Sequence, residues 1–188
     1  TWTLNGVSKT AVAASTPCGV LAPTTINAGL NIHVYSSAAP EVVAAAQLLS
    51  SYLNRITGYT FPVVSSPRPD GISLGVDGDF QAFRWPYTAQ VFEPNFRFGK
   101  QDYIIATQGS SPPRITLAGA TVEALRMAVW EFLHQLGYRQ YFPGATWEVV
   151  PSRPVISNLN LAIYRRPAFL TRDLGLQAPW GPADDPTG

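Results

Sequence analysis

The sequence predicts an α/β (α+β) fold, a single mixed sheet with two main helices packed on it. Apolar residues recur at helical spacing in two segments, 40–58 and 121–137, so each segment can bury one face of a helix. Short runs of apolar residues, or of alternating apolar and polar residues, precede and separate these segments, and such runs are typical of strands. Because helices and strands follow one another along the chain, a layer of helices on one sheet is the favoured arrangement.

Length, charge and hydrophobicity restrict the class of protein. The 188 residues suffice for one domain with a full hydrophobic core, and 46% of them are hydrophobic. The net charge is +1 and the basic residues are scattered, so we expect neither nucleic acid nor an anionic membrane as a partner. No apolar run approaches the ~18 residues of a membrane span.

The cysteine count and the loop-forming residues bear on the compartment. Cys18 is the only cysteine, which excludes an intrachain disulfide and leaves a thiolate zinc site with one ligand at most. Pro and Gly are abundant, at 17 and 15 residues, and aromatic residues make up 12% of the chain. This loop-rich composition with few lysines favours a secreted protein, either extracellular or periplasmic.

The N-terminal part of the chain predicts strands and loops. Residues 1–30, interrupted by Pro17 and Pro23, predict an edge strand or two. Residues 31–35 alternate apolar and polar side chains, which predicts a half-buried strand. His33 has no second metal ligand nearby in this segment and is interpreted as a structural or surface histidine.

The first main helix is expected from Pro40 to Gly58. Proline favours the first helical turn, and glycine suits the left-handed position that follows a helix. Its apolar stripe consists of Val42, Ala46, Leu49, Leu53 and Ile56.

The middle of the chain carries a strand and an aromatic segment. Residues 72–76 predict a strand that ends in a polar turn with Asp77 and Asp79. These two acids do not indicate a calcium-binding loop, because the distal Glu of such a loop is missing. Residues 80–98 are rich in Phe, Trp and Tyr. They form either a loop that contacts saccharides or a loop that packs its rings onto its own domain or a neighbour.

The second half predicts a hairpin followed by the second main helix. Residues 102–107 and 114–118 predict strands joined by a short Gly/Ser/Pro-rich return. Thr121 suits the N-cap, and Gly137 ends the helix before an aromatic-rich strand.

This helix contains a near-match to a zinc-protease motif. In that motif two histidines four residues apart bind zinc, and the Glu beside the first activates a water. Glu131 and His134 occupy the matching positions, but Trp130 replaces the first histidine. An indole nitrogen is only a donor and cannot bind zinc, so we expect no metal site and interpret Glu131 and His134 as a hydrogen-bonded pair.

No other catalytic constellation can be identified in the sequence. Cys18 lies between prolines without an adjacent base, and no pair of carboxylates suited to glycoside hydrolysis can be selected. The sequence therefore predicts no catalytic residue, no metal and no cofactor.

The order of motifs resembles the small α/β domain that precedes the barrel in glycoside hydrolases. The matching pieces cover roughly residues 31–175. The clearest are Ile115–Thr121, Ala128–Leu133, Leu136–Arg139 and Tyr141–Gly144. The resemblance is to hydrolases of the β-N-acetylhexosaminidase (family 20) and α-glucuronidase (family 67) type.

This resemblance implies a zincin-like, hexosaminidase domain 2-like fold that is non-catalytic and packs on the catalytic barrel. It implies an N-terminal extension over 1–30, the accessory domain over 31–160, and the first strand of a truncated barrel over 161–188. Arg172 matches the arginine that reaches the sugar pocket in family 20, although Asp173 replaces the usual following glycine. A barrel needs ~250 residues, so we expect a fragment of a longer enzyme.

Three functional hypotheses follow. The first is a non-catalytic N-terminal domain of a secreted glycoside hydrolase, whose partners are its own barrel and carbohydrate. The alternative is a stand-alone carbohydrate-binding module that uses segment 80–98. The third, a zinc hydrolase, would require stoichiometric metal.

Overall fold

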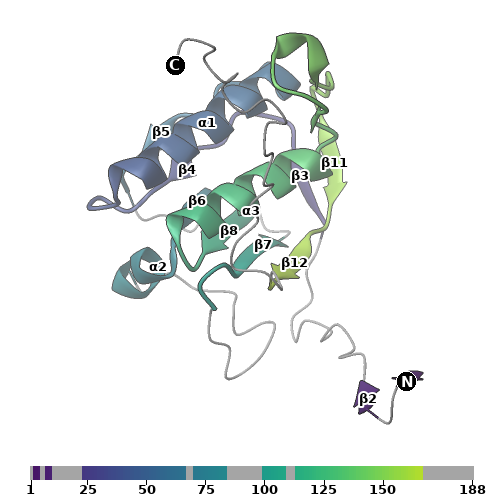
Figure 1. Cartoon of the computed structure of the whole chain (residues 1–188). Helices are drawn as coiled ribbons and strands as arrows, with labels where there is room; N and C mark the ends of the chain where they lie inside the picture. The colour runs from purple at the N-terminus through teal and green to yellow at the C-terminus, as the bar shows by residue number, and fades with distance from the viewer. Residues whose placement is uncertain are drawn as a thin grey trace, which may run out of the picture.

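The main sheet is mixed and has six strands in the order β12-β7-β8-β6-β4-β5 (Figure 1). The computed structural model describes residues 2–4, 7–9, 23–66, 70–83, 99–108 and 113–166. Strands β4, β5, β6 and β8 are parallel, whereas β7 is antiparallel to β8, and β12 to β7. The strands are β4 Ile32–His33, β5 Val63–Val64, β6 Gly71–Val76, β7 Tyr103–Gln108, β8 Arg114–Gly119 and β12 Ala162–Arg165. The predicted mixed sheet and the β7–β8 hairpin are confirmed.

Within the described residues, three two-stranded sheets accompany the main sheet. They pair β1 (Trp2–Leu4) with β2 (Val7–Lys9), β3 (Thr24–Ile26) with β11 (Ile156–Leu159), and β9 (Arg139–Gln140) with β10 (Glu148–Val149). Strands β3 and β12 lie outside the range 31–160, so the folded unit uses residues on both sides of it. The predicted start of a barrel stays a prediction, since residues 167–188 lie outside the described part of the chain.

The two main helices lie beside each other on one face of the sheet (Figure 1). Helix α1 spans Pro40–Thr57 and ends at Gly58, whose φ of 80° is left-handed as predicted. Helix α3 spans Val122–Gln135, and the backbone N–H of Ala124 donates to the Thr121 hydroxyl at 3.3 Å, which confirms the N-cap. The whole predicted stripe of α1 is buried and meets the sheet.

The polar turn predicted at Asp77 and Asp79 is wrong, because Asp77–Phe83 forms helix α2. The Asp79 carboxylate accepts a hydrogen bond from the backbone N–H of Val76 at 3.0 Å. An acid at the third helical position thus satisfies an N–H that the helix start leaves unpaired, and its charge favours the positive end of the helix dipole. Phe80 is buried and packs this helix inward.

The segment around His33 is more deeply buried than expected. Strand β4 is only two residues long and lies between β5 and β6, so both of its residues are buried and the predicted half-buried pattern is wrong. His33 Nδ1 lies 2.8 Å from the backbone oxygen of Ser66. A carbonyl only accepts, so Nδ1 carries the proton. The structural interpretation of His33 is confirmed.

Some predicted features fall outside the described residues, namely Cys18, Arg172 and residues 84–98 of the aromatic segment. Within the described ranges, no helix combines the length and hydropathy needed to cross a membrane.

Candidate functional site

The near-motif on α3 is part of an aromatic cluster. The Trp130 ring lies 5.4 Å from that of Tyr52 on α1 and 5.6 Å from that of Tyr138, measured between ring centroids. The His134 ring is nearly parallel to the Tyr138 ring, at an interplanar angle of 13°. In the described ranges, no group of three His, Cys, Asp or Glu side chains is placed to hold a metal ion.

The predicted hydrogen bond between Glu131 and His134 is wrong. The Glu131 carboxylate instead accepts from the side-chain amide of Gln135 at 2.8 Å and lies 3.6 Å from the Arg165 guanidinium. Gln135 is one full turn further along the helix, where its long side chain can reach back to the acid. His134 is left with its ring against Tyr138.

Next to the C-terminal ends of both helices, residues 138–149 form a small projecting unit, which we call the flap (Figure 1). It consists of β9, a 3-10 turn over Ala145–Trp147, and β10. Three of its aromatic side chains are exposed: Tyr141 by 67%, Phe142 by 61% and Trp147 by 53%. The rings of Phe142 and Trp147 meet edge to face with centroids 5.2 Å apart, so the exposed rings support each other.

The flap is attached to α1 through Glu148. The Arg55 guanidinium donates two hydrogen bonds to the Glu148 carboxylate, at 3.0 and 2.5 Å, and lies 5.0 Å from the centre of the Tyr52 ring. The buried Tyr138 hydroxyl donates to the same carboxylate at 2.9 Å. A bidentate guanidinium–carboxylate contact constrains orientation as well as distance, so it orients the flap relative to α1.

These contacts shift the pKa values of two flap residues, Glu148 and Tyr138. The hydrogen bonds from Arg55 lower the pKa of Glu148 to about 2, although burial of the carboxylate acts in the opposite direction. Burial raises the pKa of Tyr138 above its usual range, and hydrogen bonds with Tyr52 and Glu148 act in the same direction. At neutral pH Glu148 is therefore an acceptor and Tyr138 a donor.

Between α3 and the flap lies an open hollow of about 430 Å³. Ligand sites usually have volumes of ~300–1,000 Å³ and combine apolar walls with a few polar groups. The hollow is lined by Trp130, His134, Tyr138, Gln140, Tyr141, Phe142 and Pro143.

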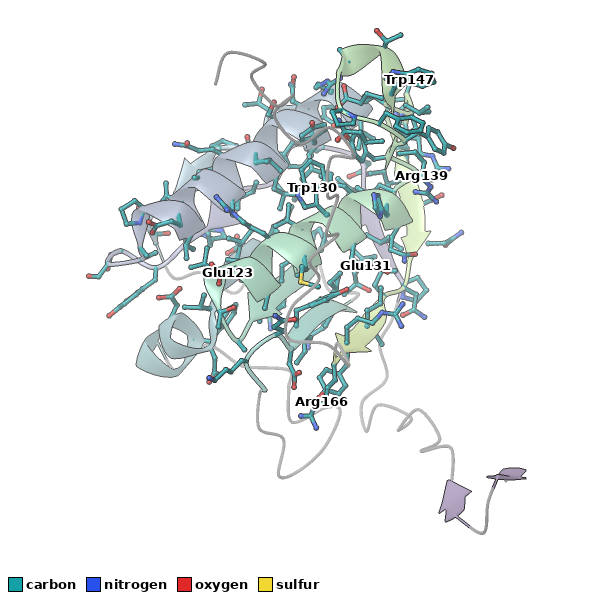
Figure 2. All side chains as sticks on the ribbon, in the orientation of Figure 1. Glu123, Trp130, Glu131, Arg139, Trp147 and Arg166 are labelled. Carbon is teal, nitrogen blue, oxygen red and sulfur yellow. The ribbon has the colours of Figure 1, made fainter. Side chains whose placement is uncertain are left out.

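A second groove of about 270 Å³ follows the line between α1 and α3. It is lined by Ala44, Ala45, Leu48, Arg126, Val129 and Trp130. Trp130 lines both depressions and lies between the two helices in Figure 2, which also labels Trp147 on the flap. The two depressions therefore meet at Trp130.

Sequence reasoning found Trp130, Glu131 and His134 but assigned them to a degenerate metal motif. The hollow that contains Trp130 and His134 was missed, because it forms only when the flap folds back onto α3. The sequence does contain a signal for the hollow. Shortly after Gly137, three aromatic residues surround a proline and a glycine, a pattern that is unusual for core residues: Tyr141, Phe142 and Trp147.

No protein-family model matches the chain, and no curated protein matches it in sequence. Its fold is similar to part of a family GH115 4-O-methyl-α-glucuronidase with specificity for decorated arabinogalactans. The TM-score is 0.58 at 16% identity, and the match covers 77% of this chain and 18% of that chain. This likeness shows a shared fold.

Two glycoside hydrolases of family GH20 match with lower TM-scores. The β-N-acetylhexosaminidase from Streptomyces coelicolor has a TM-score of 0.46 at 23% identity, over 77% of this chain and 25% of that chain. The exo-β-N-acetylglucosaminidase from Vibrio harveyi has 0.45 at 11% identity, over 84% and 19%. This chain therefore spans about a quarter or less of each of these enzymes. The glucuronidase among them belongs to family 115, whereas the sequence resemblance indicated family 67.

Proposed function

We propose that this chain is a non-catalytic accessory domain of a secreted glycoside hydrolase, which packs against the catalytic barrel and stabilises it. The observation that carries the proposal is the fold match, in which 77% of this chain corresponds to 18% of a much longer α-glucuronidase. When a domain makes up so small a share of a hydrolase, the rest of that enzyme is large enough to contain a separate catalytic domain. The resemblance to a hexosaminidase domain 2 and its zincin-like geometry belong to the same proposal.

The groove between α1 and α3 supports this role. Ala44 is exposed and Leu48 half-buried along it, and Trp130 forms its far end. Contact between an apolar groove and water is unfavourable in free energy, so burial of the groove under another surface would stabilise the protein. We assign this groove to the contact with the barrel, and the catalytic acids to the barrel itself. Arg172 would then contribute to the sugar pocket on the barrel side.

The first test of the proposal is activity. The 188-residue chain should release no product from aryl glycosides of glucuronic acid or N-acetylglucosamine, and the encoding reading frame should continue for several hundred residues. Turnover that co-purifies with the chain, or a frame that ends at Gly188, would contradict the proposal.

The second test is a charge placed in the groove. In the longer enzyme, Ala44→Arg should lower the thermal inactivation midpoint, because a guanidinium would be buried against the barrel. Gln47→Arg is the matched control, since Gln47 is exposed on the same helix and does not line the groove. Equal midpoints for the two variants would rule out the groove as the contact.

The alternative, a carbohydrate-binding module that uses segment 80–98, is not favoured by the described residues. Phe80 is 2% exposed and serves the core, and residues 84–98 lie outside the described part of the chain. This alternative stays a prediction, for which loss of glycan binding in Trp85→Ala is the test.

A further inference from the structure

We propose that the hollow between α3 and the flap binds a neutral saccharide. The choice of a saccharide as ligand rests on the proposed role in a glycoside hydrolase, whereas the hollow itself does not. The inference concerns a contact made by this domain, distinct from any pocket of the barrel. Three properties of the hollow support the proposal: exposed aromatic rings, polar side chains with free hydrogen-bonding capacity, and uncharged lining residues.

The ring faces come from the flap. Tyr141 and Phe142 are 67% and 61% exposed and both line the hollow. Phe142 is supported from outside by Trp147, and the flap that carries both is fixed to α1 by the Arg55–Glu148 contact. A sugar ring presents a flat array of C–H groups, which packs on such a face. Because the flap is already in place, little conformational entropy is lost on binding.

The polar groups are His134 and Gln140. The His134 ring packs against Tyr138, and among the described residues its nitrogens have no hydrogen-bond partner. The Gln140 side-chain amide lies 3.3 Å from the Tyr138 hydroxyl, whose single hydrogen is donated to Glu148, and within the described ranges it has no other hydrogen-bond partner. Sugar hydroxyls can donate to and accept from both residues. A covering polypeptide would bury these polar groups unpaired unless it supplied matching partners, at a cost in affinity.

The lining also indicates the charge of the ligand. Among the described residues that line the hollow, none is Asp, Glu, Lys or Arg. Of the neighbouring ions, Arg55 and Glu148 satisfy each other and the Tyr138 hydroxyl, and the Arg139 guanidinium donates to the backbone oxygens of His134 and Tyr138. Among the described lining residues, a uronic acid or a sulfated sugar would find no counter-ion, so we assign the hollow to an uncharged sugar unit.

Calorimetric titration of the 188-residue chain tests this inference. The probes are hexamers of cellulose, of xylan and of N-acetylglucosamine, with hexagalacturonate as the charged comparison. At least one neutral hexamer should bind, and more tightly than the charged one. Phe142→Ala and Tyr141→Ala should each weaken binding by about tenfold or more, because a central ring supplies much of such an interface. Val155→Ala is the control, since Val155 is 52% exposed but lies outside the hollow.

Two further variants separate a saccharide from a polypeptide. His134→Phe keeps the ring on Tyr138 and removes its nitrogens, and Gln140→Leu keeps the size and removes the amide. Each should weaken saccharide binding about three- to tenfold, as loss of one hydrogen bond does, with urea midpoints confirming that the variants fold. If no neutral hexamer binds, or if these variants bind as well as the wild type, the inference is wrong. Such a failure would leave the Ala44→Arg test of barrel contact unaffected.

Discussion

The Arg55 guanidinium on α1 and the Glu148 carboxylate on the flap form a two-point contact between residues 93 positions apart. Folding lowers the pKa of Glu148 from 4.5 to about 2, so the ionised carboxylate stabilises the folded state. One pKa unit corresponds to about 1.4 kcal/mol. Since the Arg55 side chain is 43% exposed, solvent screening reduces the contribution, and we expect about 1–2 kcal/mol.

The first prediction concerns Glu148→Gln. At pH 7 it should lower the free energy of unfolding by about 1–2 kcal/mol. Because the folded pKa is the lower one, this stabilisation is complete above pH ~4.5 and is lost as the pH falls towards ~2. Urea unfolding of both proteins between pH 7 and pH 2 measures the difference. A difference that does not shrink on acidification would show that the contact is not ionic.

The second prediction concerns Asp102, which is 2% exposed just before β7. A single carboxylate oxygen, Oδ2, accepts from the Gly99 backbone N–H at 2.7 Å, the Tyr164 hydroxyl at 3.0 Å and the Arg166 Nε at 3.0 Å. Asp102→Ala leaves these donors without their acceptor and should cost about 2–3 kcal/mol. Asp102→Asn can keep an oxygen in place and should cost less than half as much, because the Arg166 side chain is 60% exposed and its ion pair is screened. Equal urea midpoints for the two variants would contradict this.

The third prediction concerns Trp130→His, which restores the first histidine of the zinc motif. We expect no stoichiometric zinc by elemental analysis and no protease activity, because the variant supplies only the two histidines of the motif and the nearby Glu131 carboxylate is engaged by Gln135 and Arg165. The variant should lose about 1–3 kcal/mol of stability with its contacts to Tyr52 and Tyr138. Trp130→Phe is the control, since it keeps an aromatic ring. Zinc bound at one equivalent after dialysis would refute the interpretation.

The fourth prediction compares two glycines. A Cβ on Gly119, where β8 turns into α3, would lie 2.3 Å from the backbone nitrogen of Leu125, so Gly119→Ala should destabilise by about 2 kcal/mol or more. A Cβ on Gly78 in α2 would meet nothing within 4 Å. Gly78→Ala should therefore stabilise by up to about 1 kcal/mol through helix propensity. Thermal unfolding measures the change in midpoint for each variant, and we expect the midpoint to fall for Gly119→Ala and to rise for Gly78→Ala.

The helices α1 and α3 were predictable because their signals are local: an apolar stripe, a cap and a terminal glycine. Helix α2 was not, because Asp77-Gly78-Asp79 is typical of a turn. It becomes helical through the hydrogen bond that the Val76 N–H donates to the Asp79 carboxylate, together with the burial of Phe80. The flap and its hollow depend on the contact between Arg55 and Glu148, which no local pattern reveals. Long-range pairs of this kind require the folded chain.

The pairing of β3 with β11 has a consequence for how such a unit can be used. Thr24 is the strand partner of Leu159, so the first strand of the 23–166 region and one of its last lie side by side. A unit built in this way cannot be shortened at one end without removing a strand partner from the other end.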